Sequence, residues 1–220
     1  MDEFKTEEAD ELPQTSVTSP RWTGAPSIAL ARGINEQCVE LLCDLAASSS
    51  IEEFPRFILQ NRDLWRLLEP DARKRVAAFP FVIVDLCFQD AESWQRALQG
   101  HLMSAIDSTH YSGIPSKLFE DLLLETLLFA RQAAREDISV AKAMFAMIPS
   151  VATAIASLTL PQVRTIAIGN THLLRVRWDS QPEFWGHLLL ACRGRDERAM
   201  AALRRQGKLL FCGELIESHQ

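Results

Sequence analysis

The sequence lacks the residue patterns that most enzymes and metalloproteins display. It contains no glycine-rich phosphate loop, no serine–histidine or cysteine–histidine nucleophile motif and no histidines at metal-ligand spacing. Its five cysteines are an odd number without a close C-x-x-C pair, so they predict neither a disulfide framework nor a zinc site. We therefore expect a protein that is not an enzyme and that uses no metal or cofactor.

Long apolar runs and targeting signals are missing as well. No run approaches the roughly 18–20 apolar residues of a membrane helix, and the first residues are acidic, unlike a secretory signal. Hydrophobic residues make up 47% of the 220 positions and charged residues 24%, which is ordinary for a soluble globular protein. We expect a cytoplasmic protein that does not contact a membrane and has one large or two small domains.

Charge is distributed unevenly along the chain. Residues 1–110 hold 10 Lys and Arg against 18 Asp and Glu, a net charge of −8. Residues 111–220 hold 13 against 11, a net charge of +2. This asymmetry indicates two units with different partners, although solvated faces of ordinary proteins also produce it.

The order of apolar and helix-breaking residues predicts an all-α protein in three parts. Residues 1–27 are acidic and then rich in Ser, Thr and Pro, which predicts a disordered tail. Residues 28–110 predict a bundle of short helices, in which the apolar run 81–88 favours a buried helix over a buried strand. A linker is expected within residues 101–115, and a second helical domain over residues 116–218.

The most informative stretch runs from Met144 to Trp178. Thr159 is expected to cap a helix that has Pro161 in its first turn. The Gly-Asn pair that follows predicts the end of this helix, since both residues tolerate the left-handed conformation. From Leu174 onward apolar residues alternate with arginines, which predicts a short strand or extended segment with one buried face.

This stretch resembles the FlhD family, the flagellar master transcriptional regulators of bacteria. The resemblance begins with Ala143-Met144-Phe145 and includes the unbroken sequence Leu-Thr-Leu-Pro-Gln at 158–162. Matching residues follow in register: Ala167, Asn170, Arg177 and Trp178. The resemblance covers about residues 116–215, and the segment before the Leu-Thr-Leu-Pro-Gln sequence is slightly shorter than in the family pattern.

The resemblance implies an all-helical subunit that dimerises, joins an FlhC-type partner carrying the zinc site, and activates transcription on promoter DNA. We expect a homodimer or a larger hetero-oligomer. We assign five residues to the subunit or partner interface: Leu122, Phe145, Arg175, Arg177 and Trp178. Because this chain has a long segment before the matching part, we carry over dimerisation and transcriptional control but leave the target genes open.

The C-terminal part of the second domain predicts a helix-turn-helix-like hairpin with a basic second helix. Residues 182–191 and 197–211 are the two helices, and a Gly-containing turn joins them. Such a second helix is the shape that enters a major groove, although many helical hairpins carry exposed arginines. With the resemblance, we expect six phosphate contacts: Arg193, Arg195, Arg198, Arg204, Arg205 and Lys208. The other basic cluster, residues 73–75, is interpreted as a solvated face.

Three functional classes are therefore compared. The first is a transcriptional regulator subunit that acts with a partner on DNA. The second is a protein-binding adaptor or chaperone without direct DNA contact, which would use the acidic first half. The third, an enzyme, has the least support because the chemical motifs named above are missing from the sequence.

Overall fold

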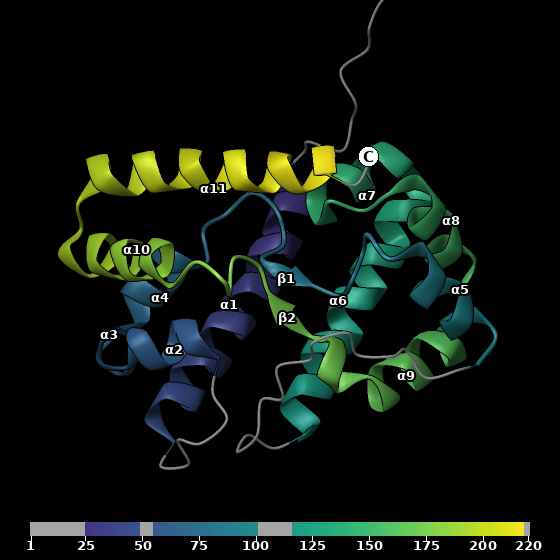
Figure 1. The fold of residues 1–220 in the computed structure, drawn as a ribbon, viewed down its shortest axis with the longest axis horizontal. Helices are drawn as coiled ribbons and strands as arrows, with labels where there is room; N and C mark the ends of the chain where they lie inside the picture. Colours follow the sequence, from purple (N-terminus) through teal and green to yellow (C-terminus); the bar gives the residue numbers. More distant parts are fainter. Residues whose placement is uncertain (1–24, 49–54, 101–115, 218–220) are drawn as a thin grey trace, which may run out of the picture.

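The computed structural model describes residues 25–48, 55–100 and 116–217, and these are predominantly helical. The described residues form eleven α-helices and two strands of two residues each (Figure 1). This confirms the expected all-α class. Nearly all of the expected tail and the whole expected linker lie outside the described residues. The FlhD-like character of the second half stays a prediction.

The first half of the chain contributes five helices and one strand, and their boundaries follow local sequence signals. Asp90 caps the last of these helices, since its side chain accepts a hydrogen bond from the Ser93 N–H at 3.0 Å. The elements are α1 (Ala25–Ala47), α2 (Arg56–Gln60), α3 (Arg62–Arg66), α4 (Pro70–Val76), β1 (Val84–Asp85) and α5 (Ala91–Leu98).

The second half contributes six helices, a 3-10 turn and one strand. The elements are α6 (Ser116–Glu136), α7 (Ile138–Phe145), α8 (Pro149–Ser157), α9 (Leu160–Gly169), η2 (Thr171–Leu173), β2 (Arg175–Val176), α10 (Pro182–Gly194) and α11 (Glu197–Glu217). The expected cap of α9 is confirmed, because Thr159 and Gln162 form a reciprocal capping box. The expected end of α9 is confirmed, since the helix stops at Gly169. Asn170 is not left-handed, however: its φ is −132°, and its side-chain amide donates to the Ile166 carbonyl.

The preference for a helix over residues 81–88 is also wrong. The segment is extended, and β1 within it pairs antiparallel with β2, with Val84 opposite Val176 and Asp85 opposite Arg175. This pairing also confirms the short strand expected after residue 174. The strand forms because β2, which is remote in the sequence, pairs with it. This pairing supplies the backbone hydrogen bonds that a helix would make within itself.

The rest of the extended segment obtains its backbone hydrogen bonds from neighbouring helices. The Val82 N–H donates to the Met144 carbonyl at 2.9 Å, and the Ile83 N–H donates to Asn35 Oδ1 at 2.9 Å. Asn35 is fully buried in α1, and its amide also donates to the Phe81 carbonyl. Buried polar groups need such partners, so this asparagine fixes the segment against α1.

The elements are arranged around α1 and α6, which lie beside the two-stranded ladder (Figure 1). Helices α2, α3, α4 and α10 lie to one side, and α5, α8 and α9 lie to the other. Buried side chains from both halves of the chain form one hydrophobic core. The division into domains 28–110 and 116–218 stays a prediction about folding units, and the two parts share this core.

Helices α7 and α8 are the most apolar consecutive pair of helices. No single described helix is both long and apolar enough to cross a bilayer. Taken together, α7 and α8 reach that length and composition, but they are bent by 110° where they meet.

Helix α11 packs at a glycine against aromatic residues that flank the two strands. A Cβ atom at Gly207 would lie 2.7 Å from a ring carbon of Phe79 and 3.3 Å from a ring carbon of Trp178. Farther along the same face of α11, the Phe211 ring stacks on Phe81 with the centroids 4.2 Å apart. The missing side chain at position 207 therefore allows the helix to approach the aromatic core closely.

We expect Gly207→Ala to destabilise the protein by about 1–3 kcal/mol, because the added methyl group overpacks a rigid aromatic contact. The gain in helix propensity, roughly 1 kcal/mol, offsets only part of this cost. Urea unfolding followed by circular dichroism measures the change. Gly213→Ala in the same helix is the matched control, since a Cβ there meets nothing within 4 Å. Equal effects of the two substitutions would contradict the close approach.

Candidate nucleic-acid interface

The expected helical hairpin is formed by α10 and α11. Arg195, with a φ of 54°, ends α10 in the left-handed conformation, and its position lies just before the start of α11. The Asp196 N–H donates to the Ala191 carbonyl at 3.0 Å, and the Asp196 carboxylate accepts from the Ala199 N–H at 2.9 Å. These bonds satisfy groups left unpaired at both helix ends, so the turn has a defined shape.

The six basic residues expected to contact phosphate lie on and beside this hairpin. Five are exposed and Arg204 is half-buried. Within the described part of the chain, none of the six forms an ion pair with a carboxylate. Their charges are therefore available to an external anion. Asp196 and Glu197 lie in the same turn and reduce its net positive charge.

Helix α4 adds basic residues that the sequence interpretation did not assign to this surface. The Arg75 guanidinium donates through Nε to the Cys192 carbonyl at 2.9 Å, which joins α4 to the end of α10. Burial raises the pKa of Cys192 to about 11, and the nearby charges of Arg204 and Arg75 act in the opposite direction. Lys74, next in the chain, is exposed. Arg75 of α4 and Arg204 of α11 therefore both lie near the end of α10.

We call this group of basic residues the hairpin surface. It consists of the basic residues of the hairpin together with two neighbouring basic residues of α4: Lys74, Arg75, Arg193, Arg195, Arg198, Arg204, Arg205 and Lys208. Arg73 is not part of it, because its guanidinium pairs with Glu40 of α1. The interpretation of residues 73–75 as only a solvated face is therefore incomplete. The triplet was visible in the sequence, but its contact with α10 was not.

Four of the five residues assigned to a subunit or partner interface lie inside the chain. Leu122, Phe145, Arg177 and Trp178 are all buried, with exposed fractions between 0% and 6%. Their contacts are made with other segments of the same chain. Arg175 is half-buried and pairs with Asp179 at 3.5 Å.

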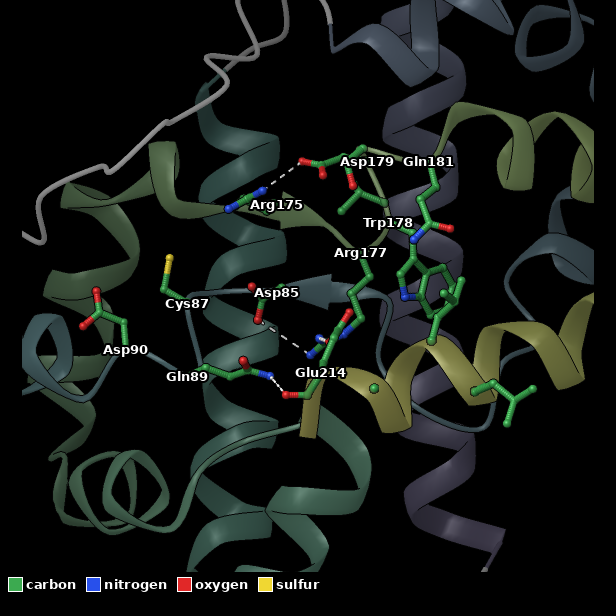
Figure 2. Close-up of a pocket in the computed structure, with 15 residues that line it drawn as sticks. Asp85, Cys87, Gln89, Asp90, Arg175, Arg177, Trp178, Asp179, Gln181 and Glu214 are labelled. Carbon is green, nitrogen blue, oxygen red and sulfur yellow. Dashed lines mark hydrogen bonds and ion pairs between the residues drawn. The ribbon is translucent and has the colours of Figure 1, made fainter. Parts of the chain in front are cut away.

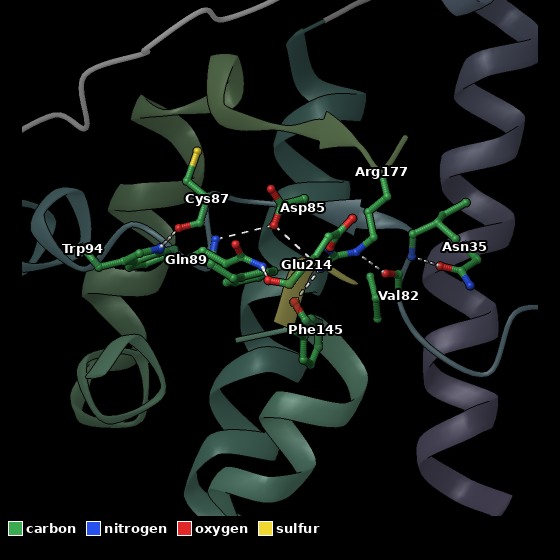
Figure 3. A network of polar contacts seen from close by, with 11 residues as sticks. Asn35, Val82, Asp85, Cys87, Gln89, Trp94, Phe145, Arg177 and Glu214 are labelled. Carbon is green, nitrogen blue, oxygen red and sulfur yellow. Dashed lines mark hydrogen bonds and ion pairs between the residues drawn. The ribbon is translucent and has the colours of Figure 1, made fainter. Parts of the chain in front are cut away.

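Arg177 is the centre of the polar network in Figure 3. Its Nε donates to the Val82 carbonyl at 3.0 Å, and its two terminal nitrogens reach the Phe145 carbonyl and the Glu214 carboxylate. Asp85 lies 3.7 Å from the same guanidinium. One side chain at the end of β2 thereby connects the extended segment, the end of α7 and the end of α11.

A hollow of about 710 Å³ opens beside this network. Figure 2 shows the side chains of Asp85, Cys87, Arg175, Arg177 and Glu214 around it. Burial raises the pKa of Glu214 despite the adjacent guanidinium, and burial raises the pKa of Cys87 to about 11. A thiol with such a pKa is mostly protonated near neutral pH and is a weak nucleophile. Beside the hollow, the Arg177 guanidinium pairs with the carboxylates of Asp85 and Glu214.

Neither a metal site nor a known relative indicates the function of the described residues. Among the residues with described side chains, no group of three or more His, Cys, Asp and Glu could hold a metal ion. Comparisons of the chain with protein-family models, with curated proteins and with solved structures return no match.

Proposed function

We propose that the protein is a subunit of a transcriptional regulator and that it contacts DNA through the hairpin surface. The observation that carries the proposal is the meeting of α4 with the end of α10, where the Arg75 guanidinium donates to the Cys192 carbonyl. These residues are 117 positions apart. A basic side chain of the first half is thereby placed beside the basic hairpin of the second half, although the chain as a whole has a net charge of −6.

The electrostatic properties of this surface suit a phosphate backbone. Exposed arginines and lysines without carboxylate partners can neutralise phosphates and release the counterions condensed on DNA, which favours binding at low salt. The resemblance to FlhD supports duplex DNA in a promoter as the polyanion and transcriptional activation as the outcome. It also supports a second protein of the FlhC type as the partner in the DNA complex.

The proposal predicts that Arg193→Ala, Arg198→Ala and Arg205→Ala combined abolish most of the affinity for duplex DNA, while the fold is retained. The slope of log affinity against log salt should become shallower by roughly 0.9 for each phosphate that the variant no longer neutralises. Fluorescence anisotropy with a labelled duplex, measured over a salt series, gives both quantities. Lys74→Ala alone should weaken binding as well, because α4 belongs to the same surface.

The matched control removes three exposed arginines that lie elsewhere: Arg32, Arg135 and Arg164. It changes the net charge by the same amount and should leave both the affinity and the salt slope close to those of the unmodified protein. Equal losses in the two triple variants would mean that only the overall charge matters. Unchanged binding in the hairpin variant would show that the DNA contact lies elsewhere or belongs to the partner.

A protein-binding adaptor is the second candidate, and a groove between α1 and α6 favours it. This groove, of about 540 Å³, is lined by Leu30, Ile34, Leu128 and Phe129 among others. Leu30 is 48% exposed and Leu128 is 38% exposed, so an apolar helix of a partner could pack there. A partner that loses affinity on Leu30→Glu, together with DNA binding that is absent at low salt, would support the adaptor.

A further inference from the structure

Elements of the two halves recur at one fixed spacing of 91 positions. Strands β1 and β2 begin at residues 84 and 175, which are 91 apart. Helices α1 and α6 are the long helices that precede them in the two halves of the chain. Helix α4 begins at residue 70 with a proline, and position 161, which is 91 farther on, is the proline in the first turn of α9. Helices α5 and α10 begin at residues 91 and 182.

The detailed backbone geometry also repeats at this spacing. Cys87 and Trp178 both have a positive φ, 54° and 59°, which is uncommon for residues other than glycine. The Asp90 N–H donates to the Cys87 carbonyl at 2.9 Å, and the Gln181 N–H donates to the Trp178 carbonyl at 2.8 Å. Two helices of unrelated origin would not be expected to share a left-handed residue, a turn hydrogen bond and a start at equivalent positions.

A tryptophan in the first turns of α5 and α10 repeats in the same way. Trp94 and Trp185 are 91 positions apart, and both are almost completely buried. The Trp94 indole donates to the Cys87 carbonyl at 3.1 Å, and the Trp185 indole donates to the Arg177 carbonyl at 3.3 Å. Each tryptophan therefore ties its helix to the segment that immediately follows the strand of the same repeat.

The strand pairing is symmetric under exchange of the repeats. Val84 is paired with Val176, and Asp85 with Arg175. Moving each residue to its counterpart 91 positions away turns the first pair into the second and the second into the first. Antiparallel pairing with this property is what a two-fold axis through the ladder produces.

The last helix of each repeat packs on the other repeat. Helix α5 of the first repeat packs against α8 of the second, whereas α10 of the second repeat packs against α2, α3 and α4 of the first (Figure 1). Neither repeat encloses its core by itself. This reciprocal exchange is the arrangement of an intertwined dimer, here within one polypeptide.

We infer that the chain is an internally duplicated, single-chain counterpart of a two-fold dimer, so that its working unit is one chain with one hairpin surface. Each repeat receives from the other the contacts that a second copy would supply. Helix α11 breaks the symmetry. The positions 91 before it run into α6, and α6 does not pack against α5 in the way that α11 packs against α10. The expectation of a homodimer is replaced by a pseudo-dimer formed within the chain.

This inference changes the kind of DNA site that we expect, and in that respect it rests on the proposed function. Two-fold dimers read palindromic sites because each subunit supplies one reading element. Among its described residues, this pseudo-dimer supplies the hairpin surface once. We therefore expect one chain to engage one site that lacks two-fold symmetry.

The mass of the intact protein in solution provides the test. Sedimentation analysis of the full chain across a wide concentration range should give the single-chain mass of 24.8 kDa. A stable species of twice that mass would overturn the inference. With DNA, the expected stoichiometry is one chain per duplex. A failure to bind DNA would count against the proposed function but would leave the mass measurement unaffected.

An engineered disulfide between β1 and β2 tests whether the two paired strands belong to the same chain. Val84→Cys with Val176→Cys places two thiols directly opposite each other, within the usual reach for a disulfide between paired strands. Cys212→Ser in the same protein removes an exposed thiol that could join two chains. After oxidation, a single-chain band on a non-reducing gel supports the inference. A disulfide-linked pair of chains would show that the repeats exchange between copies and would overturn it.

Discussion

Replacing Arg177 with alanine is expected to destabilise the protein by about 3–5 kcal/mol, because it removes one partner from a buried ion-pair network. The guanidinium side chain is only 2% exposed. It donates to the Val82 and Phe145 carbonyls and pairs with Glu214 and Asp85. Alanine would leave all four acceptors without this donor, and an unpaired buried polar group costs much more than a hydrogen bond contributes.

Two features determine where in that range the effect should fall. The side chains of Glu214 and Asp85 are 27% and 26% exposed to solvent. Water can therefore replace part of the hydrogen bonding that they lose when the guanidinium is removed. The Arg177 guanidinium also lies over the Phe211 ring, 5.1 Å from its centroid, and this cation–π interaction would disappear as well. Since folded domains have only about 5–15 kcal/mol of stability, the loss should be a large fraction of the total.

Urea unfolding of the Arg177→Ala and Arg175→Ala variants measures the difference. Arg175 lies two positions earlier and its replacement removes the same charge, but its side chain is 41% exposed and its partner Asp179 is 3.5 Å away. Exposed pairs of this kind contribute below about 1 kcal/mol. Similar destabilisation by the two substitutions would contradict a central role for the Arg177 network. Arg177→Lys should remain damaging, because one ammonium cannot replace the guanidinium fork.

Helix starts could be predicted from sequence where a capping residue lies within a few positions of the helix that it begins. The cap predicted at Thr159 begins α9 as its side chain suggests. Asp90 and Asp137 cap α5 and α7 through the same kind of local hydrogen bond. Residues 81–88 were misassigned because strand formation there depends on a partner about 90 positions away, at residues 175 and 176. Helical periodicity and β-branched content cannot reveal such a partner.

The duplication was in principle readable from the sequence. Pro-Asp-Ala-Arg at 70–73 and Pro-Gln-Val-Arg at 161–164 share only proline and arginine, and the tryptophans at 94 and 185 complete the spacing. Each coincidence is weak by itself. In the structure, three further features recur at the same spacing of 91 positions: a helix start, a residue with positive φ, and a tryptophan whose indole donates a hydrogen bond.

The candidate site was predicted in part. The basic residues of the hairpin could be identified from sequence because a helix with arginines and lysines on its exposed side is a local feature. The contribution of α4 could not, since the hydrogen bond between Arg75 and Cys192 joins remote segments. Likewise, the buried positions of Phe145 and Arg177 follow from packing between the two repeats, which the resemblance to one family module did not include.

Replacing Trp185 with alanine is the second large effect that we expect, with a loss of about 3–5 kcal/mol. Its ring is fully buried, and its centroid lies 5.7 Å from those of both Phe57 and Trp65. These neighbours belong to α2 and α3, so the ring of α10 fills the core of the other repeat. Truncation would remove a large apolar surface and leave a cavity between rigid aromatic rings, which cannot close it without strain.

The unfolding free energy of Trp185→Ala should be compared with that of Leu190→Ala, which lies in the same helix but is 53% exposed and should change stability little. Trp94→Ala extends the comparison to the first repeat. Its ring is buried in α5 and stacks on Phe88, so a large loss is expected there too. If both tryptophans hold an exchanged helix in place, either substitution should unfold the chain in one cooperative step, because neither repeat has a complete core alone. A separate early transition confined to one half would contradict this dependence of each repeat on the other.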